Sequence, residues 1–342
     1  MKRSLFSQTM LLLAMFLGTL PLAAQSYEKL WREVEEQQKK DLPETVIRLS
    51  ENIFRKAERE NNFQQKLKAY LTRMTSRAAI SRDSLYTDIR YLNRWAEAES
   101  NRVNRAVLFF VQGKALCCIE GIYGGYEGGS ATLDKLSEWS FNALKEYGWQ
   151  CYEKAFADIA ALGKTHVDNY SFLIEKGEDS ALFGHDLLSL MLFDLKQVNA
   201  DRRSDSLMYR FYDEAIAYYQ DSGNNDAFYM MKLQKAIYEY CYGVSESRMK
   251  KEIRLADSVR AWTTVNEKKH IAPYLYHGYL NGLQNPGDSL EYVVSSNALA
   301  KYPNYKYADF FKMRRDYATS SFMNYSWNNL SLAGEKLQMN LR

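Results

Sequence analysis

The sequence has few of the residues and motifs from which active sites are built. Its four histidines stand in no HExxH, HxH or His–Cys spacing that would hold a metal ion. It contains no GxSxG nucleophile elbow, and the glycine-rich run Gly121–Ser130 lacks the flanking strand and Lys-Ser/Thr of a phosphate-binding loop. We therefore expect no enzymatic activity, no catalytic residue, no metal and no cofactor. Two catalytic carboxylates can meet in space from distant parts of the chain and need no shared sequence motif. An α/α hydrolase is therefore an alternative.

Cysteine is scarce as well, with only Cys117, Cys118, Cys151 and Cys241. The absence of a CxxC spacing argues against a metal or redox site. Cys117 and Cys118 lie in the apolar run Val107–Ile122, where they are expected to pack as small buried groups. In an exported chain a single disulfide, Cys118 to Cys151, is the alternative.

Long uncharged apolar runs are missing apart from one at the amino terminus. Lys2 and Arg3 precede the apolar stretch Met10–Leu20, and small residues lead to the expected cleavage site after Ala24. This pattern is typical of a secretory signal peptide over residues 1–24. We expect an exported protein of the periplasm or cell envelope, without a transmembrane span in the mature chain. No cysteine follows the apolar stretch, which excludes a lipid anchor at this site.

Neither sign of charge dominates the chain. It has 45 Lys and Arg against 42 Asp and Glu, and loss of the signal peptide removes two basic residues and no acidic one. The two signs are interleaved along the chain, so we expect no nucleic-acid partner.

Helical periodicity, in contrast, runs through most of the sequence. In the stretch Tyr27–Arg73 the apolar residues recur at steps of three and four, as on a helix with one buried face. We expect Asp41 to be the N-cap of the second helix, with Pro43 in its first turn, and Asn61-Asn62 to end it. The apolar positions of these helices are Leu30, Trp31, Val34, Leu42, Val46, Leu49, Ile53 and Ala57.

Similar patterns predict further helices up to about residue 304. The segment 133–162 is expected to be helical with a break near Gly148, and 163–184 to be a long connection. Small residues at Ala298 and Ala300 before a proline are typical of tetratricopeptide hairpins, although no fixed period of about 34 residues recurs. The other predicted helices are 84–99, 103–119, 187–198, 204–221, 227–242, 248–265, 271–283 and 289–304.

The fold class follows from these helices. We predict an all-α, tetratricopeptide-like stack of antiparallel helical hairpins, an α-solenoid, over residues 25–318. Near the carboxyl terminus Leu337, Met339 and Leu341 alternate with polar residues, which predicts a strand. We interpret residues 319–342 as the incomplete start of a β-sandwich domain, and expect the reading frame to continue.

Aromatic content is high, with 26 tyrosines gathered most densely in 238–242 and 273–279. Tyrosines at helical spacing usually pack between hairpins with the hydroxyl at the rim. The functional alternative is a concave surface that binds a peptide or glycan. The candidate residues for this face are Tyr238, Tyr242, Tyr274 and Tyr276.

Three short segments near the amino terminus carry a family resemblance: Tyr27–Trp31 (YEKLW), Asp41–Pro43 (DLP) and Lys68–Leu71 (KAYL). With weaker echoes at Leu136–Trp139 and Gly184–Leu188, they resemble the N-terminal helical region of Bacteroidetes-type alpha-2-macroglobulin-like envelope proteins. The resemblance implies a helical N-terminal region followed by a series of macroglobulin-type β-sandwich domains. Proteins of this family look like protease traps, in which cleavage of a bait segment triggers rearrangement.

The sequence departs from the full family pattern in one important respect. It contains no Cys-Gly-Glu-Gln thioester motif, and Cys118-Ile119-Glu120-Gly121 is not one. A bait segment and a complete β-sandwich are also missing. The resemblance therefore extends to the helical front end and assigns no trapping activity to these residues.

Three functions are open from these observations. The first is a non-catalytic exported scaffold or docking domain, whose partner is another protein or downstream domains of the same chain. The second is a free-standing periplasmic or surface protein that binds a glycan or peptide. The third is the α/α hydrolase.

Overall fold

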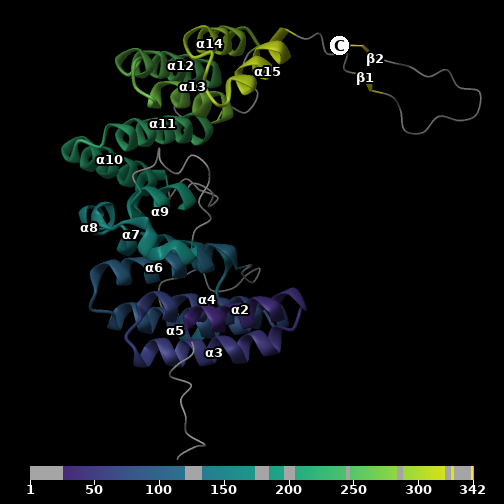
Figure 1. Ribbon diagram of the computed structural model, residues 1–342, viewed down its shortest axis with the longest axis vertical. Coiled ribbons are helices and arrows are strands. Elements are labelled where there is room, and N and C mark those ends of the chain that lie inside the picture. Colours follow the sequence, from purple (N-terminus) through teal and green to yellow (C-terminus); the bar gives the residue numbers. More distant parts are fainter. Residues whose placement is uncertain are drawn as a thin grey trace, which may run out of the picture. The chain divides into compact units, whose positions relative to one another are not determined.

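The computed structural model describes residues 26–119, 133–173, 185–195, 205–243, 247–282, 288–319, 325–326 and 340–341. These residues are almost entirely helical, and consecutive helices pack as stacked antiparallel hairpins (Figure 1). The predicted all-α, solenoid-like fold is thereby confirmed. None of the described helices is both long enough and apolar enough to cross a membrane. The chain divides into two compact units, the first containing α2 to α9 and the second α10 to β2.

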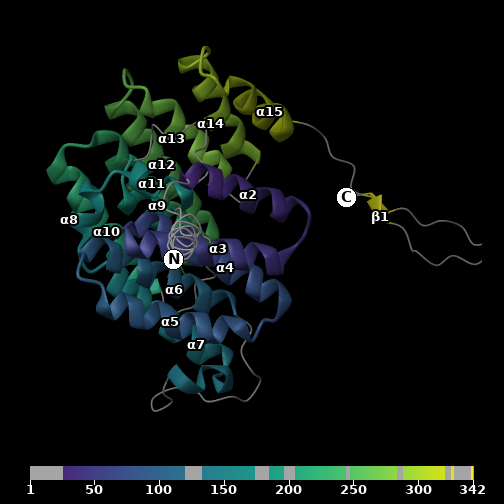
Figure 2. The same ribbon diagram turned by 60° about the horizontal axis from the view of Figure 1, so that its bottom comes forward.

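In the first unit, neighbouring helices pair along their lengths. The pairs α3 with α4 and α6 with α7 lie side by side in both ribbon views (Figure 1, Figure 2). The elements are α2 (Tyr27–Lys39), α3 (Pro43–Arg59), α4 (Phe63–Ile80), α5 (Ser84–Ala98), α6 (Arg102–Cys118), η2 (Leu133–Glu138), α7 (Phe141–Ala155), α8 (Ile159–Lys164), η3 (Val167–Leu173) and α9 (Leu187–Leu195).

The turns between the first helices use residues in the left-handed backbone region. Asp41 has a φ of 53° and Asn61 a φ of 51°, conformations that short polar residues tolerate best. The prediction that Asp41 caps α3 is therefore wrong: the N-cap is Leu42, without a side-chain hydrogen bond, and Pro43 begins the helix. The predicted end of α3 is confirmed to within two residues, and Asn62 then accepts a hydrogen bond from the backbone of Gln65 to cap α4.

The predicted break at Gly148 is also wrong, because α7 continues through it to Ala155. A Cβ atom at Gly148 would lie 2.7 Å from Cys117 Sγ and 3.1 Å from the carbonyl oxygen of Gly113. This glycine therefore permits the close approach of α6 and α7 and does not end the helix. The break comes after Ala155, and Asp158 caps the short helix α8.

The core of α3 to α5 combines aromatic packing with one buried acid. The rings of Tyr70 and Tyr91 stack with centroids 5.0 Å apart, and Trp95 meets Tyr70 edge-on at 6.0 Å. The Tyr70 hydroxyl donates hydrogen bonds to the carbonyl oxygen and to Oδ1 of Asp88, at 2.9 and 3.1 Å. Burial raises the pKa of the Asp88 carboxyl, while the nearby Arg77 opposes the shift. The acid is thus held inside the unit by hydrogen bonds.

The second unit continues the hairpin pattern. Its last helix was not predicted from the sequence, because only Phe311 is buried there and one buried position makes no periodic stripe. The elements are α10 (Asp205–Ser222), α11 (Asn225–Tyr242), α12 (Arg248–Val265), α13 (Ile271–Gly282), α14 (Asp288–Lys301), α15 (Ala308–Thr319), β1 (Tyr325–Ser326) and β2 (Asn340–Leu341).

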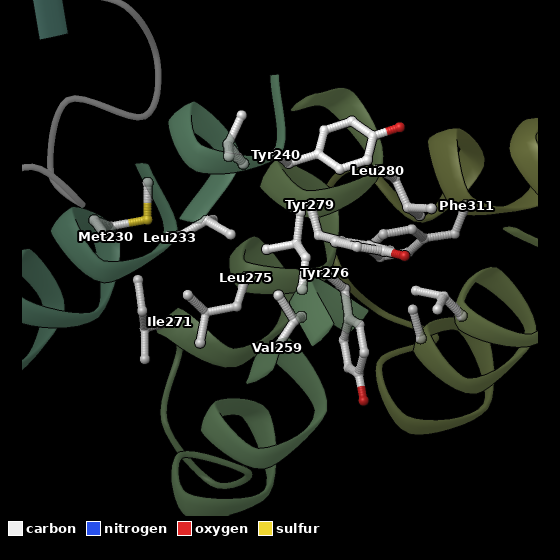
Figure 3. Close-up of a cluster of buried hydrophobic side chains, with 14 residues drawn as sticks. Met230, Leu233, Tyr240, Val259, Ile271, Leu275, Tyr276, Tyr279, Leu280 and Phe311 are labelled. Atoms are coloured by element: carbon white, nitrogen blue, oxygen red, sulfur yellow. The ribbon is translucent and has the colours of Figure 1, made fainter. Parts of the chain in front are cut away.

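One apolar cluster holds this unit together. Its side chains come from α11, α12, α13, α14 and α15, and those labelled in Figure 3 converge between the helices. Leu275 and Tyr279 are fully buried on α13, one helical turn apart, as the predicted apolar stripe requires. The tyrosines therefore contribute to the core of this unit as its aliphatic residues do.

The short β segment expected at the carboxyl terminus is present. β1 pairs antiparallel with β2, with Tyr325 opposite Leu341 and Ser326 opposite Asn340. The assignment of residues 319–342 to a β-sandwich remains a prediction. The signal peptide and the glycine-rich run Gly121–Ser130 lie outside the described residues.

Candidate functional site

Two of the predicted binding tyrosines lie on α11 and contact each other. Tyr238 is only 1% exposed, and its hydroxyl donates to Oδ1 of Asp205 at 2.7 Å. Tyr242, one turn further on, is 43% exposed, and its ring centroid lies 4.9 Å from that of Tyr238. Tyr238 is therefore a packing residue, while Tyr242 keeps a surface that a ligand could reach.

The other two tyrosines lie on α13 and contact different rings. Tyr276 is buried in the apolar cluster beside Tyr302. Tyr274 is partly exposed and meets Tyr305 edge-on, with centroids 4.9 Å apart. Tyr276 is therefore a core packing residue. Tyr274 is partly accessible, and its role in binding a ligand remains a prediction.

A candidate site among the described residues is a groove formed by α10, α11 and α12 within the second unit. It has a volume of about 360 Å³ and is lined by both charged and apolar side chains. We call it the α10–α12 groove. Its lining residues are Asp213, Ile216, Lys232, Lys235, Ala236, Glu239, Tyr240, Lys251, Arg254, Leu255, Ser258 and Trp262.

Helical spacing explains why these side chains meet. The residues from α11 and those from α12 recur at steps of three and four, so each set occupies one helix face. The helices run antiparallel, which places the Lys232 ammonium 5.0 Å from the centre of the Trp262 ring at one end. At the other end Lys251 Nζ donates to the carbonyl oxygen of Tyr240 at 2.8 Å. Lys232 and Tyr240 are eight residues apart on α11, a rise of about 12 Å along the helix axis.

Two of the four cations in this groove are paired with acids. Lys235 forms an ion pair with Asp213 across α10 and α11. Arg254 pairs with Glu239 across α11 and α12, at 2.8 Å. With four basic and two acidic side chains, the groove carries a net positive charge.

The other two cations reach no carboxylate among the described residues. Lys251 is buried and donates to the carbonyl oxygens of Tyr240 and Gly243, at 2.8 and 2.6 Å. Lys232 lies over aromatic rings, and burial lowers its pKa. The groove therefore holds positive charge that is partly removed from water and not balanced by the described acids.

Sequence analysis did not predict this site. Its charged residues follow the interleaved pattern of a solvated helix face, and the predicted tyrosines are not among its lining residues. The recurrence of basic residues on one face of two consecutive helices was the only available signal. That signal becomes informative only when the helices are known to lie side by side.

The first unit has a more open groove of about 600 Å³ between α3 and α4, rich in arginine. Arg55 and Arg73 both bind Glu51, and Arg77 lies 3.4 Å from Asp88. Burial acts to raise the pKa of Glu51, but Arg55 and Arg73 hold this pKa below its ordinary value. Because Glu51 already engages two of its four arginines and the groove is more open, it is a weaker candidate for binding an anion.

No metal site is found in the described part of the chain, where His, Cys, Asp and Glu side chains form no group of three or more suitable for a metal ion. His166 and His185 stack with ring centroids 6.0 Å apart. His277 Nδ1 lies 3.0 Å from the Tyr305 hydroxyl, and His270 pairs with Asp226.

The cysteines differ sharply in environment. Cys151 is a buried free thiol, so the alternative disulfide to Cys118 is not formed in the structure. Burial raises the pKa of the Cys151 thiol to about 12. Cys241 is exposed near the end of α11. Since the thiolate is the reactive form, a pKa of about 12 leaves roughly one Cys151 in 10⁵ ionised at pH 7.

We therefore expect a maleimide at neutral pH to modify Cys241 rapidly and Cys151 only after unfolding. Peptide mapping by mass spectrometry, with and without about 6 M guanidinium chloride, measures both rates. Modification of Cys151 in the folded protein as fast as that of Cys241 would contradict the buried position of this thiol.

Comparison of the chain with protein-family models, curated proteins and solved structures finds no match. The function is therefore argued from the chain's own residues.

Proposed function

We propose that this chain is a non-catalytic helical scaffold that docks a protein partner or other domains of its own chain. The observation that carries the proposal is the α10–α12 groove. Stacked helical hairpins present continuous surfaces of this kind, which serve as binding faces in solenoid proteins. The volume of about 360 Å³ is sufficient for a few side chains of a partner.

We also propose that the protein is exported and forms the N-terminal region of a larger protein that resembles a protease trap. Its support is the sequence resemblance to alpha-2-macroglobulin-like envelope proteins, together with a helical fold of the kind that the resemblance implies. Since the thioester motif is missing from these residues, the role proposed for them is docking. Amino-terminal sequencing of the exported protein should begin at Gln25.

The aromatic residues of the groove give less support to a glycan-binding protein. Sugars usually bind against an open aromatic face, and the Lys232 ammonium lies over the ring of Trp262. A saturable, sugar-specific signal on a glycan array, lost in Trp262→Ala, would favour that alternative over the scaffold.

Site-specific photocrosslinking in the producing cells tests the docking function. A benzophenone amino acid in place of Ser258 lies in the groove, and the same replacement of the exposed Lys312 on α15 is the control. We expect a discrete crosslinked protein from position 258 that is absent from position 312. Equal labelling from the two positions, or turnover of a polysaccharide or peptide substrate by the purified protein, would refute the proposal.

A further inference from the structure

We propose that the α10–α12 groove recognises an acidic segment of the docked partner, with two carboxylates separated by one apolar side chain. This inference rests on the proposed docking function and specifies the chemistry of the partner. It follows from the charges at the two ends of the groove and from the apolar residues between them.

The first step concerns Lys232. Its ammonium lies 5.0 to 5.7 Å from the centres of the Phe228, Tyr229 and Trp262 rings, and no carboxylate of the described residues contacts it. The rings hold the positive charge at the mouth of the groove and shield part of it from water. A carboxylate that arrives there gains a charge-assisted hydrogen bond without displacing an existing acid.

The second step concerns the opposite end. Lys251 is buried beneath Tyr240, and its contacts with two carbonyl oxygens leave its positive charge without a carboxylate among the described residues. Arg254, one turn further on along α12, is already paired with Glu239, so the charge that this end offers to a negative group is that of Lys251.

The third step concerns spacing. The backbones of Lys232 and Tyr240 are about 12 Å apart along α11, and an extended peptide rises by about 3.3 Å per residue, so residues i and i+4 match this distance. Residues i, i+2 and i+4 of an extended chain face the same side. The side chain at i+2 would then lie over Ile216, Ala236 and Leu255. The expected pattern is acid–x–apolar–x–acid.

A nucleic acid fits the groove less well, although it is also anionic. Asp213 and Glu239 are among its lining residues and neutralise Lys235 and Arg254, so the groove offers no continuous row of positive charge for successive phosphates. The pattern of charges therefore favours an acidic peptide.

Selection from a random heptapeptide phage library tests the inference. The purified wild-type protein is the bait, and the variant Lys232→Glu is used for counter-selection. We expect enrichment of peptides with two acidic residues four positions apart. Fluorescence polarisation with a synthetic selected peptide should show about tenfold or greater weakening in Lys232→Glu and a smaller loss in Lys232→Gln.

Controls separate the charge effect from misfolding. Lys312→Glu makes the same charge change on the exposed surface of α15 and should alter the affinity by less than about twofold. Circular dichroism should show the same helical content in all variants. Raising the salt from about 50 to about 300 mM should weaken binding to the wild-type protein, since the pairs are partly exposed.

The outcomes distinguish this inference from the function on which it rests. Selected peptides that lack the acidic pair, or that bind Lys232→Glu equally well, overturn the acidic segment and leave the docking function standing. Failure to select any peptide, together with no crosslink at position 258, overturns both. Binding of an oligothymidylate probe that depends on Lys232 would assign the groove to nucleic acid and also overturn the inference.

Discussion

The substitution Ile53→Asp is expected to unfold the first compact unit under conditions in which the wild-type protein is folded. Ile53 is fully buried on α3. The substitution loses about 2 kcal/mol or more of apolar burial and places a carboxylate where no water reaches it. The combined cost exceeds about 5 kcal/mol, which equals the whole stability of many domains.

A matched control separates burial from the change of residue type. Ile80, the last residue of α4, is 53% exposed. Ile80→Asp should cost no more than about 1 kcal/mol, mainly through the helix dipole. Urea unfolding followed by circular dichroism, with limited proteolysis to locate the unfolded region, measures both effects. An Ile53→Asp protein that resists proteolysis as Ile80→Asp does would show that α3 does not pack as described.

The second large effect is expected at the ion pair between Glu291 of α14 and Arg314 of α15. The glutamate side chain is 2% exposed and that of the arginine 22%, and Arg314 also donates to the carbonyl oxygen of Leu280 at 3.3 Å. Arg314→Met leaves the buried carboxylate without this guanidinium. We expect it to destabilise the second unit by about 3 to 5 kcal/mol.

The double variant Glu291→Leu with Arg314→Met should recover much of this loss, because the desolvated charge is removed together with its counterion. The surface pair Arg315–Asp316 serves as the comparison, and Asp316→Asn should cost less than about 1 kcal/mol. Chemical denaturation of the single and double variants gives the coupling energy. Equal losses from Arg314→Met and Asp316→Asn would contradict the buried character of the first pair.

Most helices could be predicted because their signal is local. The 3.6-residue recurrence of apolar side chains, with Pro43 at a helix start and Asn61-Asn62 at a helix end, depends only on neighbouring residues. The signal failed where one helix face is hardly buried, as in α15. It also failed at Gly148, where a residue that usually breaks a helix serves the contact between α6 and α7.

The predicted binding tyrosines show a second limit of sequence reasoning. Tyr238 and Tyr242 share a helix face, yet one is buried against α10 and the other is exposed. A tyrosine has the same amphipathic ring whether it packs in a core or binds a ligand. Which of these roles a tyrosine has depends on the helices packed against it, and the local spacing of residues does not specify those helices.

The amino-acid sequence alone thus determined the all-α class, the positions of most helices and a short β segment near the carboxyl terminus, because each depends on periodicity over a few residues. The tertiary structure alone decided which tyrosines are core, which cysteine is buried and where unbalanced positive charge gathers. Lys232 and Lys251 are nineteen residues apart in sequence. The antiparallel packing of α11 and α12 places both in one groove, where partial removal from water strengthens their attraction for a negatively charged group.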